Sequence, residues 1–330
     1  MKKGFSFALA ACLCFTCFGV ACKEKKKDEI YVYTPDGAPA LAFAYAMEQD
    51  ETDDGITYEV VNASTVQTYL TYKDENKNAD ICALPLNLAS KLLGSGERYQ
   101  LLGVATHGNL YLLSENGVSY TRENLVSLTG KTVGVVQLAN VPGITFKMIL
   151  AELGIAYAEL KNGEDAQADK VNLKSVSPDA VLPTAGIDAF VAPEPAASVK
   201  AEKTALEFAG SLQELYGGKQ GFPQAAVVAK RSLLEKKPEK VAEVVKLLTD
   251  GAEWLKTAEI SRVCEAVKSH LTEGLAPSLK KESLSRSAIE NSNVWFSKAQ
   301  ECKAEINGFL AKMIAVGGVA TAVEEDFFAK

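Results

Sequence analysis

The sequence predicts an α/β protein in which two lobes each contain a mostly parallel β-sheet flanked by helices. Short apolar runs alternate with helical segments between residues 30 and 235, which is typical of parallel strands buried on both faces. The chain has 330 residues, more than one hydrophobic core usually holds, and we therefore expect two lobes.

Individual strands and helices are predicted from the apolar runs and the residues that interrupt them. Strands are expected at 30–33, 57–61, 80–84, 132–136 and 187–192, with a long extended run at 101–113 that is interrupted at 106–109. Helices are expected at 38–48, 88–93, 144–153 and 238–256, the last from apolar residues at helical spacing. Ser64-Thr65-Val66-Gln67 has the spacing of a capping box, which predicts a further helix toward Asp74.

The N-terminus has the layout of a secretory signal over residues 1–21. Two lysines precede the uncharged apolar segment 4–21, and Cys22 separates this segment from the charged run 23–29. A cysteine directly after small residues resembles the lipobox of bacterial lipoproteins, in which Cys22 would carry the lipid and 22–29 would be the tether. Cleavage at Cys12 is an alternative that leaves an apolar segment on the mature chain, and an uncleaved membrane anchor is another. Each alternative places the chain at the cell membrane, facing the periplasm or the cell exterior.

Charge and cysteine content exclude several classes of protein. The formal net charge is -7, and removal of Lys2 and Lys3 with the signal changes it to -9. An acidic chain without a basic block beyond the tether argues against a nucleic-acid partner. Of the seven cysteines, Cys82, Cys264 and Cys302 remain in the mature domain. They allow one disulfide, for which Cys264 and Cys302 are the candidates, or three buried free thiols.

Catalytic and metal-binding signatures are absent from the sequence. The two histidines, His107 and His270, have no cluster of cysteines or carboxylates around them, so we expect no metal site. No Walker loop, dinucleotide fingerprint or nucleophile elbow occurs, and no cofactor is expected. His107 is the one acid–base candidate in a loop, although a lone histidine is more often structural.

One arrangement recurs four times: an apolar strand, a break rich in Gly, Pro or Asn, and a helix start. It occurs at 34–38, 85–87, 137–143 and 193–195. The carboxyl ends of strands in open α/β sheets form the crevice where ligands bind. Helix N-termini at that edge offer N–H donors and partial positive charge, which suit an anion. These loops therefore predict a rim that binds a small molecule.

The candidate ligand-binding residues lie in these loops and at the interruption of the long extended run. They are Asp36, Gly37, Ala38, Asn87, Thr106, His107, Gln137, Asn140, Gly143 and Glu194. Each has a structural alternative. Asp36 and Asn87 are also suited to cap a turn or a helix, and Asn140 and Gly143 to begin one. Thr106, His107 and Asn109 are also suited to a hinge, and Tyr216 and Phe222 either to stacking on a flat ligand or to packing at the hinge.

Glu194 lies between two prolines directly after a buried strand. If its carboxylate faces the ligand, the ligand carries a donor or a cationic group, as a zwitterion or an amino-substituted heterocycle does. The alternative is that Glu194 belongs to the first turn of the next helix and interacts with its dipole.

Residues 30–235 resemble the solute-binding proteins of ABC importers for aliphatic sulfonates, taurine, nitrate and thiamine pyrimidine precursors. The matching segments are "PDGAPALA", "ADICALPLNLASKLL", "GVATHGNLYLLS", "SLTGKTVGVVQLANVPGITFKMIL", "GIDAFVAPEPAAS" and "GFPQAAVVAKRSLLEKKPEKV".

The resemblance implies a type II periplasmic-binding fold, with lobe 1 at 30–113 and 223–330, lobe 2 at 114–222, and the ligand between them. It also implies a small-molecule ligand, an ABC permease and an ATPase as partners, and we expect a monomer.

Enzymes of the same fold are the competing class. Dehydratases that resemble chorismate dehydratase, and pyrimidine synthases that consume their own side chains, work in the cytoplasm, whereas residues 1–22 direct this chain out. The absence of an evident catalytic cluster also favours a receptor over an enzyme.

Overall fold

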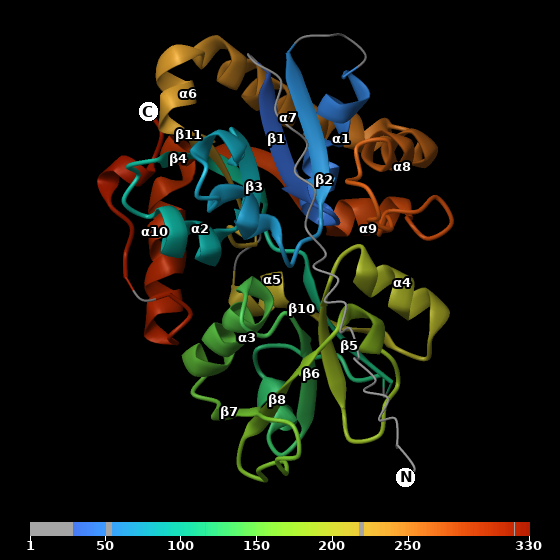
Figure 1. Ribbon diagram of the computed structural model, residues 1–330. Coiled ribbons are helices and arrows are strands. Elements are labelled where there is room, and N and C mark those ends of the chain that lie inside the picture. Colours follow the sequence, from blue (N-terminus) through green and yellow to red (C-terminus); the bar gives the residue numbers. More distant parts are fainter. Residues whose placement is uncertain (1–28, 51–54, 116, 218–220, 320) are drawn as a thin grey trace, which may run out of the picture.

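The computed structural model describes residues 29–50, 55–115, 117–217, 221–319 and 321–330. The described strands form two six-stranded sheets, with the order β12-β4-β11-β3-β1-β2 in the first and β10-β5-β9-β6-β8-β7 in the second. Figure 1 shows the first sheet in the upper half of the molecule and the second in the lower half. The predicted α/β fold class is confirmed, whereas the predicted signal peptide and Cys22 lie outside the described residues.

The first sheet contains three neighbouring parallel strands. Its strands are β1 (Ile30–Pro35), β2 (Ile56–Val61), β3 (Ile81–Pro85), β4 (Tyr99–Thr106), β11 (Ala225–Lys230) and β12 (Val294–Lys298). β1 pairs in parallel with β2 and β3, whereas β11 is antiparallel to β3 and β4, and β12 to β4. One face packs on α1 (Ala38–Glu48), α7 (Pro238–Thr257) and α8 (Ile260–Lys268). The other packs on α2 (Leu86–Leu93) and α10 (Ala299–Ala315). Two short helices, α6 (Arg231–Lys236) and α9 (Arg286–Asn291), complete this half.

The second sheet is built in the same way. Its strands are β5 (Leu110–Ser114), β6 (Thr132–Val136), β7 (Tyr157–Leu160), β8 (Val171–Val176), β9 (Ala189–Pro193) and β10 (Glu207–Ser211). β6, β7, β8 and β9 are parallel, and β5 is antiparallel to β9 and β10. The helices around it are α3 (Val141–Glu152), α4 (Ala196–Lys203) and α5 (Leu212–Tyr216). Short 3-10 helices occur at Val66–Leu70, Glu75–Lys77, Leu125–Leu128, Pro178–Ala180 and Glu325–Phe327.

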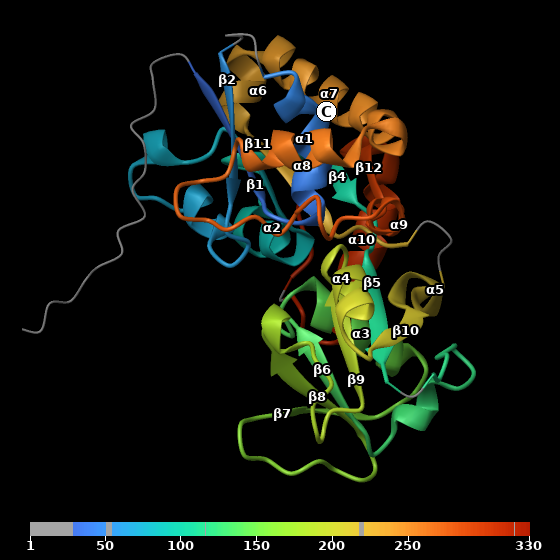
Figure 2. The ribbon, with the colours of Figure 1, turned by 90° about the vertical axis from the view of Figure 1, so that its right-hand side faces the viewer.

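The chain crosses between the sheets twice, and these crossings explain why the sheets are mixed rather than mostly parallel. It leaves the first sheet after β4 and enters the second as β5, and it returns after α5 to form β11 between β3 and β4. A strand that arrives from the other half runs against its neighbours. β5 already belongs to the second sheet, so the first crossing lies before the expected boundary at residue 113. Figure 2 shows β5 descending from the crossing into the second half.

Helix α10 contacts both halves of the molecule. Phe309 of α10 stacks on Phe222 at a ring-centroid distance of 5.4 Å, next to the second crossing. Lys312, one turn later, forms a 3.0 Å ion pair with Glu152 of α3. The C-terminal helix thus lies alongside the crossings and packs against the second half as well as the first (Figure 1).

Two local expectations are not met. The segment after Ser64 forms a 3-10 helix at Val66–Leu70 instead of an α-helix toward Asp74, because Asn62 Oδ1 accepts from both the backbone N–H and the hydroxyl of Ser64. Ser64 is therefore held in a turn and makes no capping box. The candidate disulfide is also absent, since Cys82, Cys264 and Cys302 are all buried free thiols. Within the described residues, none of the helices combines the length and apolar character needed to cross a bilayer.

Candidate ligand-binding site

The four predicted strand-to-helix loops are present, and two of them meet across the two halves. β1, β3, β6 and β9 are each followed closely by a helix, namely α1, α2, α3 and α4. Asn87 of α2 and Asn140, which precedes α3, lie 3.5 Å apart from amide nitrogen to amide oxygen. This distance is at the limit of a hydrogen bond. The predicted candidates Asn87 and Asn140 thus face each other where the two halves meet, and we refer to these loops as the cleft rim.

The N-termini of α1, α2 and α3 lack side-chain caps. Their N-cap residues are Gly37, Pro85 and Asn140, and none makes a side-chain hydrogen bond to the helix. Asparagine is a strong capping residue, yet the Asn140 side chain reaches toward Asn87 instead. N–H groups of a first helical turn have no partner within the helix. In α2 the N–H of Leu86 donates to Gln224 O at 2.9 Å. The remaining first-turn donors are suited to an acceptor that enters the cleft.

Three buried polar atoms near the rim and the crossings have no hydrogen-bond partner. They are Thr34 Oγ1 at the end of β1, Asn87 Oδ1 at the start of α2, and Gln213 Nε2 in α5. These side chains are 0%, 4% and 5% exposed. Gln213 lies at the first crossing, because its Oε1 accepts from Leu110 N–H at 2.9 Å. Each buried, unpaired polar group costs roughly 1–3 kcal/mol, and a bound molecule that pairs with it would remove that cost.

The loop between β1 and α1 contains Asp36, Gly37 and Ala38. Gly37 has φ 105°, a conformation that favours glycine, and the space where a Cβ would lie is open. Asp36 accepts from Gly37 N–H at 2.9 Å and from Ser278 N–H at 2.8 Å, so its carboxylate holds the turn, as in the structural alternative. Ala38 is buried at the start of α1.

The loop between β6 and α3 contains Gln137, Asn140 and Gly143. Gln137 has φ 56°, which is unusual for a residue with a side chain, and that side chain is exposed. Such strain occurs preferentially at functional sites. A Cβ on Gly143 would lie 2.0 Å from Leu138 O. Gly143 is therefore required for the close return of the loop onto the first turn of α3.

Thr106 and His107 lie at the first crossing and are fully engaged there. Thr106 Oγ1 accepts from Ala225 N–H at 3.1 Å. The His107 ring stacks on Trp295 at a centroid distance of 4.1 Å and an interplanar angle of 1°, and its Nε2 lies 3.2 Å from Ser297 Oγ. Burial lowers the pKa of His107 to about 4, against smaller opposing effects of hydrogen bonds to backbone groups. His107 is thus neutral at physiological pH, and its ring is packed against Trp295 at the first crossing.

Asn109 completes the network at the crossing. Its amide oxygen accepts from Gln224 Nε2 at 2.7 Å, and its amide nitrogen donates to Glu194 O at 3.1 Å. Tyr216 and Phe222 pack edge to face at 5.5 Å, and both contact Phe309. These aromatic rings form the packed core of the second crossing.

Glu194 is buried between α4 and the first half of the molecule. Its carboxylate accepts from Ser198 N–H at 2.9 Å and from Ser198 Oγ at 2.6 Å, at the first turn of α4. Asn291 Nδ2 of α9 donates to the same carboxylate at 3.4 Å. Burial raises the pKa of Glu194, and these hydrogen bonds offset only part of the increase. Glu194 lies before the N-cap residue Pro195 and thus outside the first turn in which the helix alternative places it. Its carboxylate nevertheless caps α4 and also contacts α9 of the first half.

Sequence reasoning missed Thr34, Gln213, Asn291 and Trp295. Asn291 ends α9 and Trp295 lies in β12. Their partners, Glu194 and His107, lie about a hundred or more residues earlier in the chain. The one available signal was the polar run Asn291-Ser292-Asn293 ahead of an apolar strand. The described residues contain no cluster of three or more His, Cys, Asp or Glu side chains that would hold a metal ion.

Solved structures of known proteins share this fold. An ABC transporter protein of Parabacteroides distasonis superposes with a TM-score of 0.67 at 19% identity, covering 92% of this chain and 99% of that chain. The periplasmic aliphatic sulphonate binding protein SsuA of Escherichia coli gives 0.64 at 12% identity, covering 92% and 93%. The desulfurization enzyme DSZB gives 0.54 at 14% identity, covering 92% and 96%. At these identities the likeness is one of fold, which a binding protein and an enzyme share here.

Sequence comparison gives the family. No curated protein matches the sequence. The model of the NMT1-like family matches residues 101–268, which include the crossings, the whole second sheet and the first helices after the return. With the structural likeness to the sulphonate-binding protein, this match confirms the resemblance seen in the sequence. The chain belongs to the NMT1-like family and has the type II periplasmic-binding fold.

Proposed function

We propose that the protein is the extracytoplasmic solute-binding component of an ABC importer, which captures a small organic molecule between its two halves and delivers it to a membrane permease. One observation carries the proposal. Buried polar atoms of Thr34 and Asn87 have no hydrogen-bond partner, and they lie in loops that lead into helices without side-chain caps, α1 and α2. Asn87 also faces Asn140, which precedes the uncapped helix α3 of the other half. Polar groups buried without partners at such a junction are suited to pairing with a ligand.

The charges of the rim narrow the ligand class. The loops 34–38, 85–87, 106–109, 137–143 and 193–196 contain no lysine or arginine. Their two carboxylates, Asp36 and Glu194, already accept hydrogen bonds from the protein. An acidic group of the ligand would therefore be held by helix N-termini and neutral side chains. A small organic anion or a zwitterion fits this rim, similar in kind to a sulfonate, to taurine or to a pyrimidine precursor, and SsuA is an aliphatic sulphonate binding protein.

The remaining features of the proposal come from the sequence. Cys22 would carry the lipid and anchor the chain to the cell membrane, with the domain facing the periplasm or the exterior. The partners would be a permease and an ATPase, and the receptor would act as a monomer. The two lobes would close about the crossings near Leu110–Leu113 and Ala225–Val228. In small-angle scattering, a saturating ligand should reduce the radius of gyration, and an unchanged profile would contradict a two-lobe clamp.

A thermal-shift screen over small sulfonates, amino sulfonates, carboxylates and pyrimidines tests the function. A ligand that binds only the folded state raises the melting temperature, and calorimetry then gives its affinity. The Asn87→Ala variant should show a smaller response at the same ligand concentration, whereas Asn76→Ala, which replaces an exposed asparagine on the first half, should respond as the native chain does. A panel without any response, or a ligand that Asn87→Ala binds as tightly as the native chain, would overturn the proposed site.

An enzyme on the same fold is the second candidate, because DSZB shares the fold. His107 offers little support for it, since burial keeps the ring neutral and Trp295 covers one of its faces. Incubation of each identified ligand with the protein, followed by mass spectrometry, separates the two functions. Intact recovery of the ligand supports a receptor, whereas release of a product would establish an enzyme.

A further inference from the structure

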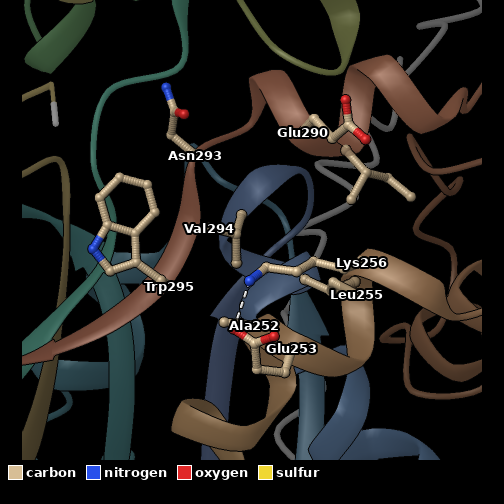
Figure 3. A pocket seen from close by; sticks show the side chains of 9 residues that line it. Ala252, Glu253, Leu255, Lys256, Glu290, Asn293, Val294 and Trp295 are labelled. Atoms are coloured by element: carbon tan, nitrogen blue, oxygen red, sulfur yellow. Dashed lines mark hydrogen bonds and ion pairs between the residues drawn. The ribbon is translucent and has the colours of Figure 1, made fainter. Parts of the chain in front are cut away.

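A cavity of about 360 Å³ lies in the first half of the molecule, apart from the cleft rim. The last turns of α7, helix α9 and the start of β12 enclose it. Figure 3 shows Trp295 on one side of the cavity and Glu290 with Lys256 on the other. The proposed import function makes no use of this space.

The walls of the cavity are mainly apolar. Its apolar lining includes Leu255, Ile289, Val294 and Trp295. A space of this size, with apolar walls and a few polar groups at its edge, is typical of a small-molecule site. An occupant should therefore have an apolar body of modest size.

The charges around the cavity favour a cation. Lys256 pairs with Glu253 at 2.5 Å, and the guanidinium of Arg286 donates to the carbonyl oxygens of Leu255 and Ala258 at the end of α7. In the described part of the chain, the Glu290 carboxylate has neither an ion-pair nor a hydrogen-bond partner. The cavity also borders the C-terminal ends of α7 and α9, which carry partial negative charge. A positive group beside Glu290 would be stabilised by that carboxylate and by the two helix ends, whereas the cations Lys256 and Arg286 already have partners within the protein.

The far side of the cavity is connected directly to the first crossing. Trp295 stacks on His107 with parallel rings. Asn293 donates from Nδ2 to Gly108 O at 2.6 Å, and its carbonyl accepts from His107 N–H at 2.9 Å. A molecule packed against Trp295 would thus restrain the segment about which the two halves are joined.

We propose that this cavity is a second ligand site, which binds an organic amine with an apolar body and is coupled to the hinge through Trp295 and His107. The apolar body packs on Leu255, Val294 and Trp295 (Figure 3), and the ammonium group lies near Glu290. An amine bound in the cavity would change the affinity of the cleft for its own ligand. Because coupling between two sites is reciprocal, the cleft ligand would change the affinity of the cavity for the amine by the same factor.

The two histidines of the chain provide the readout. NMR spectra of the protein with isotopically labelled histidine report two sites. His107 stacks on Trp295 of the cavity wall, whereas His270 pairs with Asp50 at 2.9 Å and does not line the cavity. Titration with 2-phenylethylamine should shift the His107 signals saturably and leave those of His270 in place. The neutral 2-phenylethanol should bind more weakly, and the anionic 3-phenylpropionate most weakly of the three.

Three variants complete the test. Ala252→Phe fills the cavity and should abolish the shift. Glu290→Gln removes the exposed charge without threatening the fold and should weaken binding of the amine about two- to fivefold, as expected for a half-exposed ion pair. It should leave binding of 2-phenylethanol unchanged. The control Glu239→Gln removes a carboxylate from the opposite end of α7 and should change nothing. Failure of the amine to shift His107 saturably, equal binding of 3-phenylpropionate, or equal effects of Glu290→Gln and Glu239→Gln would overturn the proposal.

Discussion

The cleft rim and the crossings contact each other through Asn109 and Glu194. They differ in how far their buried polar groups are hydrogen-bonded within the protein. At the crossings, Thr106, Asn109 and Gln224 satisfy one another or the backbone, and His107 is enclosed by Trp295 and Ser297. At the rim, Thr34 Oγ1 and Asn87 Oδ1 are buried without partners, and three helices begin without side-chain caps.

The difference distinguishes structure from function in this fold. Buried polar groups are almost always hydrogen-bonded, and each exception needs a reason. The crossings must hold one geometry, and their polar groups are paired, with Gln213 Nε2 as the exception. If the rim is the ligand site, as we propose, it exchanges protein contacts for ligand contacts, and a bound ligand would pair with its unpaired groups. Glu194 is the test case, because it lies in a rim loop and yet is paired in the manner of the crossings.

The largest expected effect comes from the aromatic core of the crossings. Phe222 is fully buried and stacks on Phe309. Phe222→Ala should lower the free energy of unfolding by about 3–5 kcal/mol, because it removes a buried ring and leaves a cavity. Urea denaturation measures this change. The control is Phe208→Ala in β10, whose side chain is 44% exposed and should cost far less. Similar losses for the two variants would mean that the second crossing is not a packed core.

A second prediction concerns pH and His107. Burial lowers the pKa of His107 in the folded protein to about 4, from its ordinary value of 6.5. The unfolded chain therefore binds a proton more readily than the folded chain, and this histidine reduces stability as pH falls from about 6.5 to about 4, by on the order of 3 kcal/mol. Above pH 6.5 its contribution is constant. The difference in unfolding free energy between the native chain and His107→Asn, measured against pH, should follow this window.

His270 provides the opposite sign within the same protein. Burial alone would lower its pKa, but hydrogen bonds to Asp50 and to the carbonyl of Ala266 raise it overall. Its stabilising contribution is thus full below the unfolded pKa and is lost as pH rises through the folded pKa. A His270→Gln variant should therefore lose more stability at low pH than at high pH. If both histidine variants showed the same trend, the contrast between the buried neutral ring and the paired ring would be wrong.

The sequence predicted those strands and helices that are determined by neighbouring residues, and it missed those that depend on pairing with distant ones. The strand at 132–136 and the helix from Pro238 were predicted closely because apolar runs and helical periodicity are properties of neighbouring residues. β7, β8, β10 and β12 were not predicted. β12 is half-exposed along most of its length and becomes a strand by pairing with β4, almost two hundred residues earlier in the chain.

In the candidate site, too, features set by neighbouring residues were predicted, whereas features that depend on distant residues were not. The four rim loops were predicted, since each is a local strand–turn–helix pattern. Which side chains would be paired was not predictable, because the partners of Glu194 and His107 include Asn291 and Trp295 from a distant segment. No local pattern distinguishes Asn109, which is fully hydrogen-bonded, from Asn87, which retains an unpaired oxygen.

A third prediction tests the unpaired rim directly. Asn87→Ala removes a buried acceptor that has no partner, so the unfolding free energy should change by less than about 1 kcal/mol. Ligand affinity should fall about 5- to 100-fold if a ligand donor pairs with Asn87 Oδ1, because such a bond contributes about 1–3 kcal/mol when its loss leaves a group unpaired. Calorimetry with the ligand identified by the thermal-shift screen measures it. A large loss of stability with unchanged affinity would place Asn87 with the crossings.

The smallest effect on ligand binding is expected at Glu194. This residue lies in a rim loop, but its carboxylate is hydrogen-bonded within the protein, as the polar groups of the crossings are. A glutamine at this position retains the shape but keeps only one acceptor oxygen, whereas the carboxylate accepts from both the N–H and the hydroxyl of Ser198 and from Asn291. Glu194→Gln should therefore lower the unfolding free energy by about 1 kcal/mol, the typical contribution of a helix cap, and leave ligand affinity unchanged. Ser198→Ala removes only the hydroxyl donor and should produce a smaller loss of the same sign.

If Glu194→Gln instead weakened ligand binding without lowering the melting temperature, the carboxylate would leave Ser198 to contact the ligand. The ligand would then carry the donor or cationic group of a zwitterion, and the fourth rim loop would belong with the other three.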